Sequence, residues 1–188
     1  MKGLSEPLRS RGGAPPEGRR GRATADVRSA VALYPTGVTV VSVRDGDLML
    51  GMTAGSFSWA SLSPPLALTS IRGGAPIREA IVRAQGFAVS VLTETQEPLA
   101  RYFADPRRPP GRAQFTMVDW WPAPVTSAPM LGTCLAWFDC LLTDVATVGG
   151  HDVVFGRVVW ADGMAGPAPL LYFQRSYHRL QPLTEEES

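Results

Sequence analysis

The stretches that decide the fold of this chain are Tyr34-Pro35-Thr36-Gly37-Val38-Thr39-Val40-Val41 and Gly51-Met52-Thr53-Ala54-Gly55-Ser56-Phe57. Between them lies a polar turn that contains Asp45-Gly46. An Asp-Gly pair flanked by apolar, β-branched runs is typical of a tight β-hairpin. We therefore predict two antiparallel strands, at 38–43 and 48–53, joined by this turn.

Strand patterns continue along the rest of the chain, with short helices inserted among them. Further strands are predicted at 66–71, 87–92, 133–143, 152–160 and 170–173. Helices are predicted at 27–34, at 77–84 and, after a Thr93–Gln96 capping box, to about Phe103. The proline-rich segment 104–129 is predicted to be a long loop, held down by Trp120 and Trp121. This order, without βαβ alternation, favours an all-β-dominated, closed Greek-key barrel with a few short helices over a Rossmann domain.

Composition limits the classes of partner. The chain has 188 residues, of which 45% are hydrophobic and 19% charged, as in an ordinary single globular domain. Lysine and arginine number 18 against 17 acidic residues, so net charge gives no reason to expect nucleic acid or a membrane surface. No apolar run approaches the roughly 18 residues of a membrane span. We therefore expect a small-molecule ligand and a cytoplasmic protein.

The two ends of the chain differ in composition from its middle. Residues 1–23 are rich in arginine, glycine and proline, and we expect a flexible tail there. Arg19-Arg20 is not followed by an apolar segment, which argues against a twin-arginine signal, although a transit peptide or an anion-binding arm stays open. A single domain is expected at 24–180, followed by an acidic tail at 181–188.

The two cysteines are expected to be buried, free thiols. Cys134 and Cys140 fall in one predicted strand, where six positions separate them by about 20 Å, too far for a disulfide. With two histidines and no C-x-x-C motif, the ligands for a structural zinc site are missing. No metal is therefore predicted.

Together with later landmarks, the two opening stretches resemble the flavin reductase-like, FMN-binding split-barrel family. The landmarks are Ser61-Leu62-Ser63-Pro64-Pro65-Leu66, residues 86–92, Gly149-Gly150-His151 and Tyr177-His178-Arg179-Leu180. The resemblance covers roughly residues 24–180 and implies an FMN-binding split β-barrel. It also implies reduction of FMN or FAD by NADH or NADPH, and a homodimer in which the second subunit completes the flavin site. Reduced flavin would then pass to a partner monooxygenase.

The same resemblance implies a set of site residues. The flavin would be bound by Thr36, Gly37, Thr53, Ala54, Gly55, Ser56 and Ser61, its phosphate would face Arg72, Gly73 and Gly74, and His151 would place the nicotinamide. Small residues permit close backbone approach to a planar ring, and backbone N–H groups at a helix start attract phosphate. Each of these residues is also an ordinary turn former, so a purely structural role stays open.

Three positions depart from the family pattern. Gly55 stands where asparagine or serine is common, segment 71–76 lacks the usual phosphate-binding hydroxyls, and Phe173 follows Tyr172 where histidine is usual. The chain also has no H-E-x-x-H and no G-x-S-x-G motif, so a cofactor would have to supply the chemistry.

These departures keep other functions open. One alternative is a flavin-independent barrel, without cofactor, that cyclises or rearranges an apolar natural-product-like substrate. Its pocket would be lined by Trp59, Trp120, Trp121, Met130 and Phe173. A non-catalytic flavin carrier is a third possibility.

Overall fold

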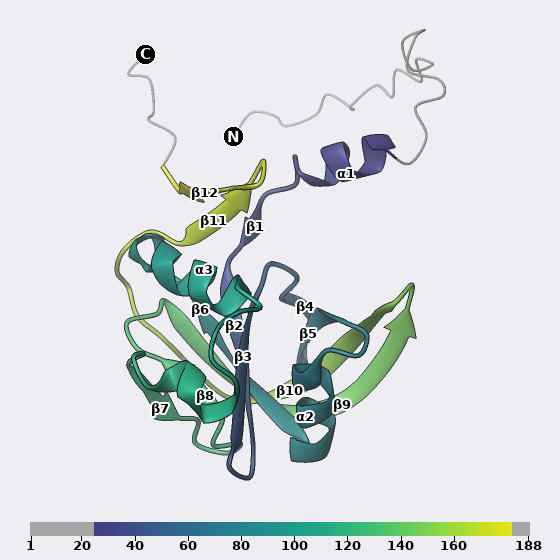
Figure 1. Ribbon diagram of the computed structural model, residues 1–188, viewed down its shortest axis with the longest axis vertical. Coiled ribbons are helices and arrows are strands. Elements are labelled where there is room, and N and C mark those ends of the chain that lie inside the picture. Colours follow the sequence, from purple (N-terminus) through teal and green to yellow (C-terminus); the bar gives the residue numbers. More distant parts are fainter. Residues whose placement is uncertain (1–24, 182–188) are drawn as a thin grey trace, which may run out of the picture.

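The computed structural model describes residues 25–181 (Figure 1). The predicted N-terminal tail, residues 1–23, and all but the first residue of the predicted acidic tail, 181–188, lie outside the described residues. Within them, no helix is long and apolar enough to cross a membrane.

The main sheet has seven strands in the order β3-β2-β6-β9-β10-β5-β4, and all neighbours in it are antiparallel. Its strands are β2 (Thr39–Asp45), β3 (Leu48–Ala54), β4 (Ser58–Leu62), β5 (Pro65–Arg72), β6 (Gly86–Val91), β9 (Ala136–Val148) and β10 (His151–Gly163). The two edge strands, β3 and β4, follow each other in the chain and are joined by residues 55–57. The sheet therefore turns back on itself without closing. This arrangement agrees with the predicted split β-barrel and corrects the expectation of a closed one.

Smaller elements surround the barrel. A second sheet has the order β1-β11-β12, with β1 (Thr36–Gly37), β11 (Leu170–Phe173) and β12 (Ser176–Arg179). The helices are α1 (Ala25–Val31), α2 (Pro76–Ala84), α3 (Glu97–Ala104) and the 3-10 turns η1 (Glu94–Gln96) and η2 (Gly111–Phe115). In Figure 1, α2 and α3 cover different parts of the barrel, whereas α1 projects away from it.

Local sequence signals explain several of these boundaries. The predicted hairpin is formed by β2 and β3, with Gly46 at φ +61° in its turn. The capping box is present, and the Thr93 backbone N–H donates to Gln96 Oε1 at 2.9 Å. Helix α2 ends in the left-handed residue Gln85, at φ +56°, and Gly86 begins β6. The first helix ends at Val31, earlier than predicted.

The long segment 104–129 is ordered by contacts with the core. It contains η2 and the strand β7 (Trp120–Pro122), which pairs with β8 (Pro129–Leu131). The buried carboxylate of Asp139 accepts hydrogen bonds from the Val125 backbone N–H (2.7 Å) and from the Thr126 backbone N–H and hydroxyl. Trp120 packs against the core cluster under α3, and the ring of Trp121 lies 5.0 Å from that of Trp137. Both tryptophans therefore hold the loop, as predicted.

Both cysteines are free and buried, as predicted. Cys134 precedes β9 instead of lying in it, because the strand begins at Ala136. Burial raises the pKa of each thiol to about 12. Since the thiolate is the reactive form, neither side chain is poised for redox chemistry in the folded protein.

We expect the native protein to resist iodoacetamide at neutral pH and the unfolded chain to take up two labels. Mass spectrometry after timed labelling checks this. Modification of either thiol at the rate of a free cysteine in the native protein would show that the burial of that residue is wrong.

Candidate functional site

The gap between the two edge strands is spanned by a loop that Ser56 fastens to β5. The Ser56 hydroxyl accepts a hydrogen bond from the Ser70 backbone N–H at 3.0 Å and donates to the Ser70 carbonyl at 3.1 Å. It also lies 3.2 Å from Thr69 Oγ1. The Ser56 side chain thus fixes the loop that follows β3, and its only proton is used within the protein.

Gly55, which precedes Ser56 in this loop, has a steric reason to be glycine. A Cβ atom built at Gly55 would lie 2.7 Å from Thr36 Oγ1, which is closer than real contacts allow. Thr36 belongs to β1, opposite Tyr172 of β11. The departure from the family pattern at position 55 is therefore matched by a threonine hydroxyl that occupies the space a side chain would need.

A cavity of about 220 Å³ opens beside this contact. It is lined by Thr36, Val38, Thr53, Gly55, Ala104, Tyr172 and Tyr177. Three predicted flavin-binding residues therefore share one cavity. Thr53 donates its proton to the Ala100 carbonyl at 2.7 Å, so its hydroxyl can only accept from a ligand. The Thr36 hydroxyl makes no hydrogen bond to another described residue.

Two tyrosines that the sequence patterns did not assign to the site form one wall of this cavity. The rings of Tyr172 and Tyr177 lie 5.2 Å apart, and the Arg101 guanidinium lies 4.9 Å above the Tyr177 ring. They face each other because β11 and β12 form a hairpin, whose turn residues Gln174 and Arg175 have φ of +50° and +64°. Neither turn residue is glycine or asparagine, so the usual sequence signal for this turn is missing.

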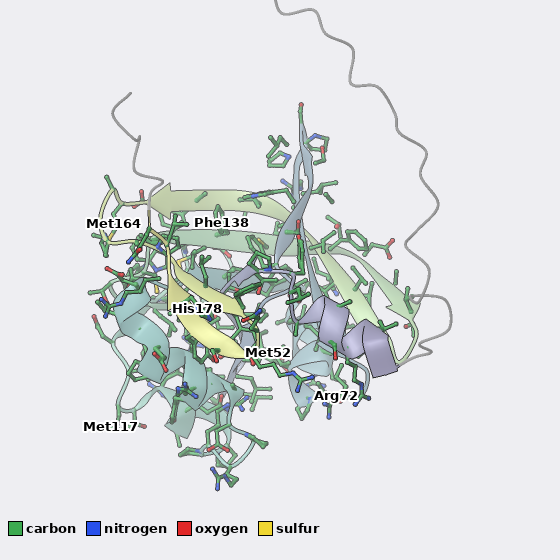
Figure 2. All side chains as sticks on the ribbon, turned by 90° about the horizontal axis from the view of Figure 1, so that it is seen from above. Met52, Arg72, Met117, Phe138, Met164 and His178 are labelled. Atoms are coloured by element: carbon green, nitrogen blue, oxygen red, sulfur yellow. The ribbon has the colours of Figure 1, made fainter. Side chains whose placement is uncertain are left out.

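A second part of the site lies further along β5. Arg72 follows Ser70 by two positions, which is roughly 7 Å along a strand. It pairs in register with His151 of β10, and both side chains are exposed. Figure 2 shows Arg72 at the outside of the barrel. Thr36 and Gly55 are thus in contact, Ser56 is bonded to β5, and Arg72 and His151 are paired further along that strand. These five residues are hereafter called the rim.

The backbone around Arg72 corrects one detail of the predicted phosphate loop. The Gly73 N–H donates to the Gly150 carbonyl at 3.0 Å, so it is not free to bind a phosphate. Gly74, at φ +74°, takes the left-handed conformation that glycine adopts without strain. Any phosphate contact from this loop would therefore rest on Arg72 and on Gly74.

A buried carboxylate supports this part of the rim from below. Asp152 Oδ2 lies 2.9 Å from Arg78 Nε of α2, and Asp152 Oδ1 accepts from the Thr147 hydroxyl at 2.6 Å. Asp152 thereby ties the start of α2 to the β9–β10 hairpin. Arg72 lies just before α2, and His151 is the first residue of β10. Both residues are therefore close in the chain to the ion pair between Arg78 and Asp152.

The other predicted site residues lie apart from these neighbours or within the barrel. Ser61 pairs with Leu66 near the opposite end of β5, roughly 20 Å along the strand from Arg72, and its hydroxyl accepts from the Ser63 N–H. Ala54 is buried, and its carbonyl accepts from the Thr39 hydroxyl at 2.9 Å. Gly37 pairs with Leu171 beside Thr36.

The pocket expected for a cofactor-free cyclase is not formed by its five predicted residues. Met130 is fully buried in the core under α3. The ring centroid of Trp59 lies 5.1 Å from that of Phe138, which packs against a second core cluster. Trp121 contacts Trp137, and Phe173 contacts His178 on the surface hairpin. Trp120, Trp121 and Met130 pack in or against the core cluster under α3, whereas Trp59 and Phe173 lie elsewhere, so the five residues do not line one pocket as expected. Among residues 25–181, no group of three or more potential ligands could hold a metal ion.

Comparisons with known proteins agree with this arrangement. The model of the family described as flavin reductase like domain matches residues 31–181. An NADH-dependent FAD reductase from Streptomyces globisporus is 38% identical over 153 residues, covering 81% of this chain and 84% of that protein. An NADH-dependent FMN reductase from Bradyrhizobium diazoefficiens is 33% identical over 156 residues, covering 83% of this chain and 85% of that protein.

Two solved structures are similar over most of their length. An NADH:FAD oxidoreductase from Streptomyces globisporus, in complex with NAD and FAD fragments, has a TM-score of 0.79 and 34% identity, covering 86% of this chain and 94% of that one. The flavin reductase component of a bacterial two-component tryptophan halogenase has a TM-score of 0.79 and 33% identity, covering 84% of this chain and 98% of that one.

Proposed function

This chain belongs to the flavin reductase like domain family, and from that membership we propose that it reduces FMN or FAD with NADH or NADPH. The names of its relatives, NADH-dependent FAD reductase and FMN reductase, support this activity. The observation in the structure that carries the proposal is the rim. A cavity with hydroxyl and aromatic walls lies at one end of it, and an exposed arginine beside a histidine lies at the other.

The residues present fit a flavin. Thr36 offers a hydroxyl without a partner among the described residues, and Tyr172 and Tyr177 offer aromatic faces for a planar ring. Arg72 has no ion pair within the described part of the chain, so its charge is available to the flavin phosphate. When bound, the flavin supplies the redox chemistry by accepting a hydride.

The protein then has to position the reactants and to exclude water. Thr36, Thr53 and Gly55 would hold the ring edge, and His151 would orient the nicotinamide on the exposed side. Holding donor and acceptor atoms about 3 to 3.5 Å apart can remove several kcal/mol from the barrier without an acid or base. This explains why the site contains few titratable side chains.

A homodimer is part of the proposal. The side chains of Val27, Val31, Leu33 and Tyr34, in and just after α1, are each more than half exposed. Such a cluster of exposed apolar residues needs a partner surface. Val31 and Tyr34 also line a cavity with Thr36 and Tyr172, so a second subunit docked on α1 would lie beside the flavin cavity.

The reduced flavin would pass to a partner monooxygenase or a similar oxygenase, as the reductase-subunit names of relatives suggest. A cytoplasmic location is proposed as well. The reaction consumes a reduced nicotinamide, and both cysteines are free.

Titration with flavin tests the binding half of this function. The purified protein should give a saturable change in the visible flavin band at micromolar FMN or FAD. A protein that binds neither flavin would contradict the proposal.

His151→Ala is expected to raise the KM for NADH or to slow flavin reduction by roughly tenfold, because the histidine would orient the donor. The dissociation constant of FMN should stay nearly unchanged, since His151 is exposed and does not line the flavin cavity. His178→Ala is the matched control, because that exposed histidine contacts the Phe173 carbonyl on the surface hairpin. If His151→Ala matches wild type in both measurements, His151 is only a turn residue.

A further inference from the structure

A larger cavity, of about 480 Å³, lies along the edge of β3. It is lined by Leu48, Leu50, Met52, Ala75, Pro76, Ile77, Pro106, Arg108, Pro109, Pro110, Gly111 and Gln114. Leu48, Leu50 and Met52 alternate along β3, so their side chains share one face of the strand. The volume is within the range of small-molecule sites, and the walls are mostly apolar.

Arg108 is the one basic residue that lines this cavity, and its side chain is held in place. It donates to the Gly51 carbonyl at 2.7 Å, to the Asp105 carbonyl at 2.8 Å and to Gln114 Oε1 at 3.1 Å. All three acceptors are neutral. A guanidinium has five N–H groups, so two of them remain without a bond to a described residue.

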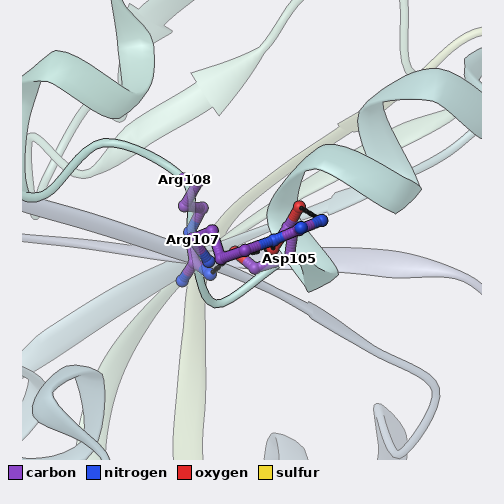
Figure 3. Close-up of polar contacts among 3 residues, drawn as sticks. All are labelled: Asp105, Arg107 and Arg108. Carbon is purple, nitrogen blue, oxygen red and sulfur yellow. Dashed lines mark hydrogen bonds and ion pairs between the residues drawn. The ribbon is translucent and has the colours of Figure 1, made fainter.

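The Asp105 carboxylate attracts Arg108 electrostatically but forms its ion pair with Arg107. Figure 3 shows the Asp105 carboxylate bonded to Arg107, at 3.0 Å to Oδ1 and 2.9 Å to Oδ2. That hydrogen bonding to Arg107 lowers the pKa of Asp105 to about 2. Burial lowers the pKa of Arg108, which indicates a cation partly removed from water. A partly desolvated cation with neutral partners is stabilised by an anionic ligand.

The position of the cavity indicates which anion fits. Ala75 and Pro76, which line the larger cavity, lie three and four positions after Arg72, and the Ala75 N–H donates to the Arg72 carbonyl at 3.1 Å. A ligand whose phosphate faces Arg72 can therefore continue into the larger cavity. FAD differs from FMN by an additional phosphate, a ribose and an adenine. The phosphate is an anion that Arg108 could bind, and the adenine is an aromatic ring that apolar walls could hold.

We propose that this cavity binds the adenylate end of FAD, with Arg108 facing the phosphate that FMN lacks, so that the protein prefers FAD to FMN. The adenine would pack among Leu50, Met52 and Pro109. This inference rests on the proposed flavin-reducing function. Arg108 already donates a hydrogen bond to the backbone of β3 at Gly51. In this proposal it also determines that FAD binds more tightly than FMN.

The test is to measure the affinities of wild type for FAD, FMN and riboflavin, together with those of Leu48→Glu and Leu48→Gln. Leu48 lines the cavity and is half-buried, so both substitutions remove the same apolar contact. Only glutamate adds a negative charge to the wall of the cavity that Arg108 also lines. We expect wild type to bind FAD roughly fivefold or more tightly than FMN, the gain of one charge-assisted contact.

In Leu48→Glu the preference for FAD should disappear, whereas Leu48→Gln should keep most of it and both variants should bind FMN as wild type does. Equal affinities of wild type for FAD and FMN would overturn this inference and leave flavin reduction standing. An unchanged preference in Leu48→Glu, with a raised KM for NADH instead, would assign the cavity to the nicotinamide dinucleotide and also overturn it. A protein that binds none of the three flavins would overturn both proposals.

Discussion

Asp152→Ala is expected to lower the free energy of unfolding by about 3 kcal/mol, the lower end for breaking a buried ion pair, because the Arg78 side chain is 30% exposed. The Asp152 side chain is only 7% exposed, and its loss leaves Arg78 of α2 and the Thr147 hydroxyl without their shared partner. The start of α2 and the β9–β10 hairpin would no longer be joined there. Chemical denaturation followed by tryptophan fluorescence measures the change.

Asp162→Ala is the matched control, because Asp162 also lies in β10 but is exposed and bonds only to the next backbone N–H. It should change stability by less than about 0.5 kcal/mol. Equal effects of the two substitutions would show that the contact between Asp152 and Arg78 does not stabilise the fold.

Arg72→Ala is expected to remove the preference of the protein for FMN over riboflavin. A charge-assisted hydrogen bond to phosphate contributes about 1.5 to 3 kcal/mol, so wild type should bind FMN roughly tenfold or more tightly than riboflavin. The effect should be concentrated in Arg72, because segment 71–76 has no hydroxyl side chain and the Gly73 N–H is already bonded to Gly150. Titrations of both flavins in the visible band give the two dissociation constants.

Arg157→Ala removes the same charge at a distance and serves as control. Arg157 pairs with Leu66, at the opposite end of β5 from Arg72, and it should leave the preference unchanged. If Arg72→Ala retains the full preference for FMN, Arg72 does not bind the phosphate, and the backbone of the loop must do so.

Features set by neighbouring residues could be predicted from the sequence. The β2–β3 hairpin follows from Asp45-Gly46, and the Thr93–Gln96 capping box forms as its spacing indicates. Strand β5 and helix α2 also lie where apolar periodicity places them. In each case the determining contacts are only a few residues apart in the chain.

Features set by residues distant in the chain were missed. Strand β4 alternates poorly and is mostly exposed, so its residues lack a half-buried pattern. Tyr172 and Tyr177 become a cavity wall only because β11 pairs with β1, far away in sequence. The role of Gly55 likewise depends on the approach of Thr36, and Arg108 could not be distinguished from the other loop arginines before its three bonds were known.

Hydride transfer tests the central claim most directly. Under anaerobic conditions, the purified protein is mixed with FAD and NADH, and the absorbance of the oxidised flavin is followed together with that of the reduced nicotinamide. We predict that both bands decrease together, in equal molar amounts and over many turnovers, and that omission of either the flavin or the protein stops the reaction. A protein that binds FAD but leaves both bands unchanged, with NADH or NADPH as donor, would contradict the assignment as a flavin reductase.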